Sequence, residues 1–218
     1  MSKKIKKFIC AIDGGASSGK TTMAKLIGKK YNFAVLYSGL LFRYAAKLIL
    51  EKKPKNKIKF LNKKFSKINY KRIKKTSLHT PEISSYSAII AKEIKVRKII
   101  KSFQKKYVKK NRKVVLEGRD MSQIFPNADV KFFVVCKPIK IAAKRRWLQI
   151  KKKKKNTSLK EVKKDLIKRD YLDKHRRHSP LVKASDSWYI NTAKLNIKGV
   201  ISKASLIIDR RIKSKYGS

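Results

Sequence analysis

Acidic side chains are scarce in this sequence of 218 residues, which has 13 Asp and Glu against 61 Lys and Arg. The formal net charge is therefore +48. Such a balance raises the question of binding to nucleic acid or to an anionic membrane. The excess is mostly Lys and is spread along the whole chain, so we interpret it mainly as a general bias in residue usage. A dedicated nucleic-acid surface and the attraction of anionic substrates remain alternatives.

Cysteine and long apolar runs are scarce as well. The two cysteines, Cys10 and Cys136, lack the spacing of metal ligands or of a CxxC motif. Both lie in apolar runs, so we expect buried free thiols in a reducing compartment. The first apolar run, residues 8–12, is too short for the core of a signal peptide, and no later run is long enough to span a membrane. We therefore expect a cytoplasmic protein.

Five short apolar runs alternate with helical patterns along the chain. The hydrophobic fraction of 42% is close to that of a globular protein, and the length suits one domain over residues 1–218. The alternation predicts an α/β fold with a five-stranded parallel sheet flanked by helices. Strands are expected at residues 8–12, 34–37, 114–116, 130–135 and 188–190, and helices at residues 21–30, 40–50, from Pro138 past Trp147, and 197–213.

Two segments do not fit this pattern. Residues 52–78 contain short alternations, such as Ile58-Lys59-Phe60 and Ile68-Asn69-Tyr70, which predict small exposed strands. One amphipathic helix is expected to follow at residues 81–107, and the whole of residues 52–107 is interpreted as an insertion. The second segment, residues 151–179, opens with five lysines and is too charged for a core. It predicts a mobile flap, or lid.

A complete phosphate-binding loop, GxxxxGK[ST], occupies residues 14–21 between an expected strand and an expected helix. Its glycines allow backbone N–H groups to turn inward around an anion. Lys20 adds a charge for the β and γ phosphates, and Thr21 offers a hydroxyl to Mg²⁺. We assign the phosphates of a nucleoside triphosphate, ATP or GTP, to Gly14, Gly15, Ala16, Ser17, Ser18, Gly19, Lys20, Thr21 and Thr22. The loop predicts a phosphotransferase but does not identify the acceptor.

Arginines and carboxylates at other strand ends bear on the acceptor. Ligands of open α/β sheets bind at the carboxyl ends of the strands, and Arg suits planar contacts with phosphate. In a chain whose positive charge is mostly Lys, arginines at these positions are informative. The groups come from separated segments: Ser38-Gly39 with Arg43, Arg97, Glu117-Gly118-Arg119-Asp120, and Arg169 with Asp173 and Arg176.

At this point the sequence closely resembles the bacterial cytidylate kinases, a family of P-loop nucleoside monophosphate kinases. The resemblance covers nearly the whole chain, and the order and spacing of its motifs are specific. The motifs are the phosphate loop, Ser38-Gly39 with Arg43, Thr80-Pro81-Glu82, Val96-Arg97, Gly118-Arg119-Asp120-Met121, Phe125-Pro126, Arg145-Arg146, Arg169-x-x-x-Asp173-x-x-Arg176, and Ser179-Pro180-Leu181.

The resemblance implies transfer of the ATP γ-phosphoryl group to CMP or dCMP with Mg²⁺. It makes residues 52–107 an insertion that binds the nucleoside monophosphate, and residues 151–179 the lid. Charge on the transferring group would be stabilised by Lys20, Arg119 and Arg169. The acceptor would be bound near its phosphate by Ser38, Arg43 and Arg119, at cytosine by Arg97, Asp120 and Arg176, and at the sugar by Arg169 and Asp173.

The chemistry of cytosine agrees with one of these assignments. A carboxylate such as Asp120 is a natural acceptor for the exocyclic amine of cytosine, and uracil would leave that carboxylate buried and unpaired. Three positions depart from the family pattern: Ala88 where a Ser is common, Glu117 where an Asp is common, and His79 where an Arg is common. These departures concern the preference for base and sugar.

Two other readings stay open. The chain is alternatively a P-loop kinase of UMP and CMP, of another nucleotide, or of dephospho-coenzyme A. A different class is a protein that binds nucleic acid or ribosomes through its positive charge, which predicts tight RNA binding with a steep dependence on salt. We expect ATP and CMP or dCMP as small-molecule substrates, no specific nucleic acid, no membrane partner, and a monomer by default.

Overall fold

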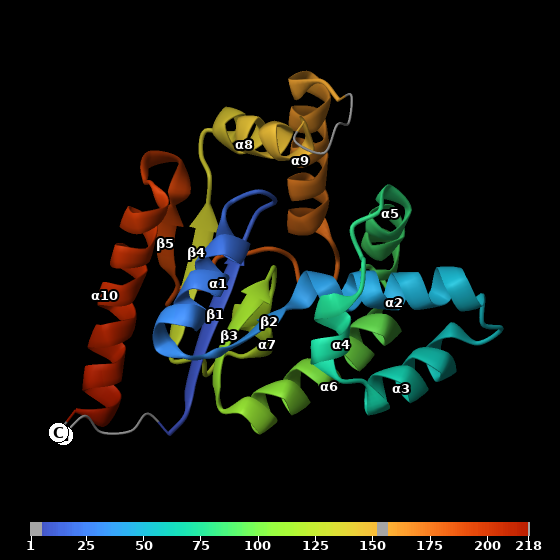
Figure 1. Ribbon diagram of the computed structural model, residues 1–218, viewed down its shortest axis with the longest axis horizontal. Helices are drawn as coiled ribbons and strands as arrows, with labels where there is room; N and C mark the ends of the chain where they lie inside the picture. Colours follow the sequence, from blue (N-terminus) through green and yellow to red (C-terminus); the bar gives the residue numbers. More distant parts are fainter. Residues whose placement is uncertain (1–5, 152–156, 218) are drawn as a thin grey trace. The chain divides into compact units, whose positions relative to one another are not determined.

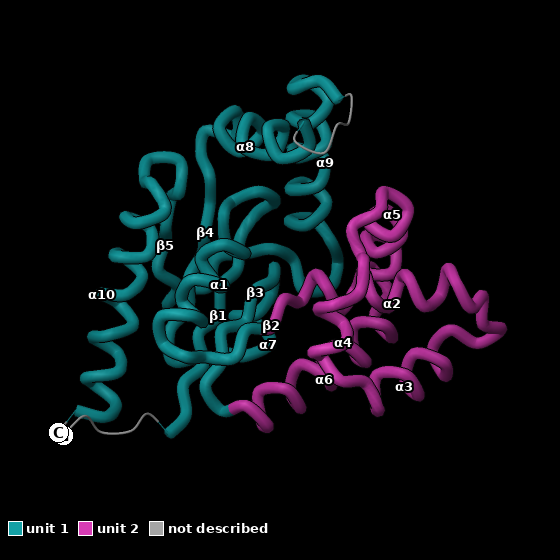
Figure 2. The backbone as a smooth tube through the Cα atoms, viewed as in Figure 1, with its two compact units in different colours: residues 1–35, 112–218 teal, residues 36–111 magenta. Residues whose placement is uncertain are grey.

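The computed structural model describes residues 6–151 and 157–217. Two compact units divide the chain (Figure 2). The first unit comprises residues 1–35 and 112–218, and the second comprises residues 36–111. The second unit is wider than the insertion expected at residues 52–107, whose role in binding a nucleotide stays a prediction.

A five-stranded sheet has the order β2-β3-β1-β4-β5 (Figure 1). Central β1 pairs in parallel with β3 and β4, and β4 pairs in parallel with β5. All seven residues of β1 are buried, as its continuous apolar run predicts for a strand inside a parallel sheet. The five expected strands are confirmed: β1 (Phe8–Gly14), β2 (Ala34–Tyr37), β3 (Lys113–Gly118), β4 (Val130–Val135) and β5 (Trp188–Asn191).

Three helices of the first unit, α1, α8 and α10, follow the expected positions, whereas α7 and α9 were not expected. Helix α1 contacts β1, β3 and α10, and α10 also contacts β4, so both helices cover the sheet. The helices are α1 (Lys20–Tyr31), α7 (Met121–Ile124), α8 (Ile139–Lys151), α9 (Leu159–His175) and α10 (Ile197–Tyr216), with a short 3-10 helix η1 (Thr192–Lys194). The parallel strands therefore bring the ends of β1 and β3 to one edge of the sheet, beside the start of α1.

The flap has more structure than its charge suggests. Helix α9 opens with a capping box, in which Ser158 Oγ accepts from Glu161 N at 3.1 Å and Glu161 Oε2 accepts from Ser158 N at 2.8 Å. Val162 and Leu166 are buried in a cluster with Ala16 and with Cys136. The prediction that this segment is too charged for a core is therefore wrong for α9, because its two apolar positions lie on one helix face. Most of the lysine run at residues 151–155 lies outside the described residues.

Helices make up the second unit after its first residues. They are α2 (Ser38–Lys52), α3 (Lys57–Lys67), α4 (Tyr70–Lys75), α5 (Pro81–Ile90) and α6 (Ile94–Asn111). The small strands expected between residues 52 and 78 are wrong. Asn56 and Asn69 instead cap α3 and α4, since their side chains accept from Lys59 N and Lys71 N. Leu61 and Phe65 then lie one helical turn apart and are both buried.

The single helix expected at residues 81–107 is also wrong, because α5 and α6 are separate. Backbone turns interrupt it, with Lys92 N donating to Ile89 O and Glu93 N donating to Ile90 O, both at 3.1 Å. Arg97 on α6 donates from Nη1 to Ala91 O at 2.9 Å, so a side chain satisfies a carbonyl group at the break. Residues 82–107 contain no Gly or Pro that would mark this break in the sequence.

Two expectations from composition are tested in the described residues. Cys10 and Cys136 are buried free thiols, as predicted, and burial raises the pKa of Cys10 far above its ordinary value. Within residues 6–151 and 157–217, no helix is long and apolar enough to cross a membrane.

Candidate active site

The phosphate loop joins β1 directly to α1. Gly14 pairs with Val134, and a Cβ atom at Gly14 would lie 2.0 Å from Val134 O, so only glycine fits against β4 here. Gly19 has φ 88°, in the left-handed region that glycine adopts without strain. The chain thus turns from the strand into the first turn of α1, where the backbone N–H groups and the positive helix end attract anions.

Lys20 lies inside this loop and is almost fully buried, with 4% of its surface exposed. Its Nζ donates to Gly15 O at 2.7 Å and lies 3.6 Å from Glu117 Oε1 at the end of β3. Burial, followed by the nearby charge of Arg119, lowers the pKa of Lys20 to about 7, although Glu117 opposes the change. The amine is therefore placed where a bound phosphate would favour its charged form.

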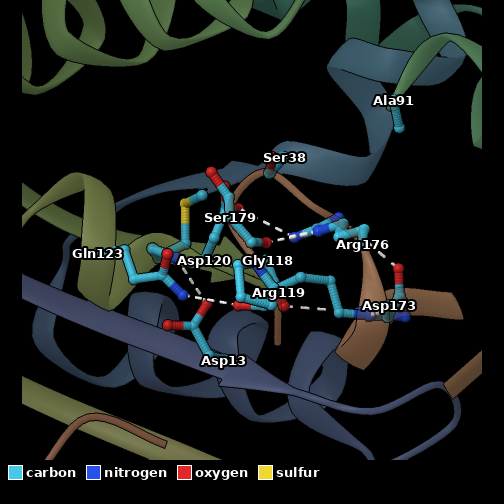
Figure 3. Close-up of polar contacts among 12 residues, drawn as sticks. Asp13, Ser38, Ala91, Gly118, Arg119, Asp120, Gln123, Asp173, Arg176 and Ser179 are labelled. Carbon is cyan, nitrogen blue, oxygen red and sulfur yellow. Dashed lines mark hydrogen bonds and ion pairs between the residues drawn. The ribbon is translucent and has the colours of Figure 1, made fainter. Parts of the chain in front are cut away.

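A cluster of ion pairs lies beyond the ends of β1 and β3 (Figure 3). Arg119 Nε donates to Asp173 Oδ2 at 2.7 Å, and Asp173 Oδ1 lies 3.7 Å from Arg176 Nη1. Arg176 Nη2 lies 4.0 Å from Asp120 Oδ1. We call these four residues, Arg119, Asp120, Asp173 and Arg176, the ion-pair cluster. Three of them are partly buried and Asp120 is buried, so their charges are weakly screened.

Charge within the ion-pair cluster shifts two pKa values. Burial works against ionisation of Asp173, but the charge and hydrogen bond of Arg119 outweigh it and lower the pKa of Asp173. Burial likewise works against the charge of Arg119, and the carboxylates of Asp173 and Glu117 outweigh it and raise the pKa of Arg119. Both groups are therefore held in their charged forms at neutral pH.

Asp13 at the end of β1 holds the backbone next to this cluster. Its two carboxylate oxygens accept from Met121 N and Ser122 N, both at 2.7 Å, and only 1% of its surface is exposed. Burial raises the pKa of Asp13 to about 6, although these hydrogen bonds oppose the change. The contacts fix the turn that follows Asp120, and so hold its carboxylate at the end of β3.

The flap helix reaches the phosphate loop through a residue that sequence reasoning did not single out. Ala16 N donates to Asp170 Oδ1 at 2.7 Å. The neighbouring Arg169, which the sequence predicts as catalytic, has an exposed side chain. Its charge nevertheless lies near enough to lower the pKa of Lys20 and of Asp173.

Thr192 of η1 holds the phosphate loop at Ser18. Thr192 Oγ1 donates to Ser18 O at 2.9 Å, and Arg145 of α8 donates from Nη2 to Thr192 O at 2.9 Å. The sequence marks Arg145 only through its resemblance motif, and Thr192 carries no sequence signal.

The remaining predicted acceptor residues belong to the second unit. Ser38, at the start of α2, is buried, and its Oγ accepts from Gln104 Nε2 at 2.9 Å. Arg43 Nη1 lies 3.3 Å from His79 Nδ1. The guanidinium of Arg97 lies over the ring of Phe42, 5.5 Å from its centroid. Ala88 is exposed, and neighbouring Ser87 donates its hydroxyl to Ser84 O at 2.8 Å.

Thr21 and Thr22 lie exposed in the first turn of α1. The Thr21 hydroxyl, one residue after Lys20, suits a site in which Mg²⁺ is bound by few protein groups and by substrate phosphates. In the described part of the chain, no group of three or more His, Cys, Asp or Glu side chains is placed to hold a metal ion.

Within the first unit, Lys20 thus lies 3.6 Å from Glu117, two positions before Arg119, and Arg119 donates to Asp173. Asp13 could have been identified from the sequence, because it is a charged residue at the end of a buried apolar run. Asp170 could not, since it is one acidic residue among many charges of a polar helix. A phosphate loop on a parallel sheet, next to arginines and carboxylates at the strand ends, defines the class of P-loop phosphotransferases.

The chain belongs to the cytidylate kinase family. The family model described as cytidylate kinase matches residues 10–210. Cytidylate kinase from Clostridium tetani is 33% identical over 223 residues, which covers 97% of this chain and 98% of that protein. Cytidylate kinase from Clostridioides difficile is 34% identical over 212 residues, covering 90% of this chain and 95% of that protein.

Solved structures support the fold at lower similarity. An uncharacterized protein from Eubacterium ventriosum has a TM-score of 0.56 at 16% identity, with 94% of this chain and 98% of that chain covered. TT1252 from Thermus thermophilus also has a TM-score of 0.56, at 15% identity, with 95% and 99% covered. These likenesses concern the fold alone.

Proposed function

We propose that the protein transfers the terminal phosphoryl group of ATP to CMP and to dCMP, producing ADP with CDP or dCDP for pyrimidine nucleotide metabolism. The observation that carries this proposal is the concentration of charged groups around Lys20, with Glu117 at 3.6 Å and Arg119 and Asp173 near enough to shift its pKa. Membership of the cytidylate kinase family supports the choice of acceptor.

The reaction is a single displacement at phosphorus. A phosphate oxygen of CMP attacks the terminal phosphorus of ATP, the bond to the bridging oxygen breaks, and ADP leaves with the electron pair. The attacking oxygen is already ionised at neutral pH, so we assign no general base. The protein's contribution is to position the two nucleotides and to stabilise negative charge.

Each assigned residue has a role that follows from its chemistry. Lys20 and Arg119 stabilise charge on the transferring group, and Arg169 joins them from the flap. The loop amides bind the phosphates of ATP. The Thr21 hydroxyl would hold Mg²⁺ together with those phosphates, and the ion would supply further charge neutralisation. The flap excludes water from the reaction.

The acceptor residues are assigned as the family resemblance implies. Ser38, Arg43 and Arg119 are assigned to the phosphate of CMP. Arg97, Asp120 and Arg176 are assigned to cytosine, and Asp173 and Arg169 to the sugar. Asp120 is the group expected to select cytosine over uracil, because a buried carboxylate needs a donor and the exocyclic amine of cytosine provides one.

A substrate panel tests this function. ADP release from ATP and Mg²⁺ is measured with CMP, dCMP, UMP and AMP for the wild type and for Lys20→Ala. We expect CMP and dCMP to be preferred, and Lys20→Ala to lower kcat/KM on the order of a hundredfold or more, because it removes charge stabilisation at the transferring phosphate.

Lys25→Ala is the matched control, since Lys25 is an exposed lysine on the same helix. It is expected to retain wild-type activity. A preference for UMP or AMP would contradict the assignment of cytosine, and CMP-dependent activity that survives Lys20→Ala would contradict the assignment of the loop.

A further inference from the structure

One face of α9 packs against the phosphate loop, and this face is apolar near the start of the helix and acidic further along. Val162 and Leu166 are buried and pack in one cluster with Ala16 of the loop. Asp170 follows after another four residues and therefore lies on the same face, one turn further along. The apolar contact thus continues into a carboxylate directed at the same loop residue, Ala16.

Asp170 is in direct contact with two loop residues. Its Oδ1 accepts from Ala16 N at 2.7 Å. Its Oδ2 would lie 2.7 Å from a Cβ atom at Gly15, which shows how closely the carboxylate approaches the backbone there. A backbone N–H directed at an anion is also the interaction by which such a loop binds phosphate. The side chain therefore uses a donor that a phosphate group would use.

Lys20 indicates which phosphate would need this donor. The amides of such a loop hold the α and β phosphates near the start of the helix, while the lysine reaches the β and γ phosphates. Here Lys20 Nζ donates to Gly15 O at 2.7 Å, so the Gly15–Ala16 end of the loop lies on the side of the terminal phosphate. Asp170 lies at this end.

We propose that Asp170 is a specificity-determining residue that competes with the terminal phosphate of a nucleoside triphosphate for the Ala16 N–H group. The inference rests on the proposed use of ATP by this loop. A triphosphate must displace a carboxylate of like charge, whereas a diphosphate ends short of Gly15 and leaves the bond in place. Asp170 therefore lowers the affinity for ATP relative to ADP, and ATP binding breaks its hydrogen bond with the Ala16 N–H group.

Nucleotide binding without turnover tests the inference. ATP and ADP are titrated with Mg²⁺ into the wild type, Asp170→Asn and Asp165→Asn by calorimetry, in the absence of an acceptor. Asp170→Asn keeps the shape and an acceptor oxygen but removes the charge. We expect it to tighten ATP binding about tenfold with little change for ADP. Asp165 is exposed on the same helix, so Asp165→Asn removes the same charge away from the loop and should behave like the wild type.

A second variant displaces the carboxylate while keeping its charge. Gly15→Ala places a methyl group 2.7 Å from the present position of Asp170 Oδ2, which is too close, so the flexible carboxylate must move. It should also shift the preference toward ATP, which keeps the proposal testable if Asp170→Asn fails to fold. An equal shift in Asp165→Asn, or weaker binding of both nucleotides by Asp170→Asn, would overturn the inference. If the wild type phosphorylates CMP and yet Asp170→Asn leaves the ATP to ADP ratio unchanged, only the inference fails. If the wild type binds neither nucleotide, the proposed function fails.

Discussion

Asp13 shows how one buried carboxylate links the central strand to the site. It accepts two backbone hydrogen bonds at 2.7 Å from the turn after Asp120. Ionised, it satisfies both N–H groups but lacks the solvation it has in water, which is why burial raises its pKa to about 6. The residue therefore stabilises the geometry of the ion-pair cluster while its own charge opposes folding.

The pH dependence of stability follows from that pKa. The pKa of Asp13 is about 6 in the fold against 3.8 for the free side chain, so the folded state binds the proton more tightly. Its contribution to the free energy of unfolding is fully present below pH 3.8 and is lost as pH rises toward about 6. The difference between these two pKa values corresponds to about 3 kcal/mol in the free energy of unfolding. We expect Asp13→Asn to remove this decline, as measured by urea unfolding between pH 4 and pH 7 (about the range in which Asp13 titrates).

Asp129→Asn is the control for this experiment. Asp129 also accepts a backbone hydrogen bond, from Ile9 N at 2.7 Å, near the other end of β1. It leaves Asp13 intact, so the decline should persist in this variant. If Asp13→Asn declines as steeply as the wild type over that range, another group titrates there and the assignment is wrong.

At the scale of the element, the N-terminus of α9 is defined by its capping box. Ser158 and Glu161 satisfy each other's backbone N–H groups, so the helix begins at a fixed residue. The starting residue determines which positions share a helix face, and Val162, Leu166 and Asp170 lie on the face toward the phosphate loop. A helix with lysine at many other positions thus has a specified orientation.

Loss of this cap should loosen the flap helix locally. We expect Ser158→Ala to lower the free energy of opening in the first turns of α9 by about 1 kcal/mol, because an N-terminal N–H group loses its acceptor. Amide hydrogen exchange at residues 160–166 measures the change.

Thr80→Ala is the matched control, since Thr80 Oγ1 caps α5 in the second unit by accepting from Ile83 N at 3.2 Å. Its faster exchange should be confined to α5. Unchanged exchange in α9 after Ser158→Ala would show that packing of Val162 and Leu166 alone fixes the start of the helix.

The sequence predicted a helix or strand correctly where one local pattern of apolar residues was sufficient to identify it. Continuous apolar runs identified all five strands. For β1, β3 and β4 the reason is burial, because a strand buried on both faces has few polar positions to confuse its period. Residues 52–78 were mistaken for strands because alternations of three residues are too short to distinguish a period of two from a helical one. The break between α5 and α6 depends on backbone turns and on the contact of Arg97 with Ala91 O, which no local pattern reveals.

The same distinction holds for the site. The phosphate loop and the groups at strand ends were predictable, because each lies at a motif or beside one. Contacts between distant segments were not, such as Ala16 with Asp170 or Ser18 with Thr192. Those pairs are separated by 154 and 174 positions, and only the packing of α9 and η1 brings them together.

At the scale of the whole molecule, the charge balance opposes the compact state. The chain has 61 basic and 13 acidic side chains, so most positive groups lack a negative neighbour to offset them. Repulsion among solvent-exposed charges falls when salt shortens the screening length. The net charge of +48 should therefore make stability depend strongly on ionic strength.

Thermal unfolding in sodium chloride tests this expectation. We expect Tm to rise by at least about 5 °C between about 0.05 M and about 0.5 M salt, because screening reduces repulsion in the folded state more than in the expanded one. Lys20→Ala is the control, since it weakens the anion site of the loop but barely alters the total charge. A rise that disappears in this variant would indicate chloride binding at the loop, and a constant or falling Tm would contradict the role of repulsion.

The division of the chain also constrains the order in which its parts can form during synthesis. The second unit is continuous, residues 36–111, and all of its residues have been made before β3 begins. The first unit is interrupted, and β1 pairs only with β3 and β4 among the described strands. The most buried strand is therefore the first of the five to be translated, and its partners follow only after the whole second unit has been made. Until residue 135 has left the ribosome, the apolar β1 lacks at least one of these two partners and is exposed to non-native pairing.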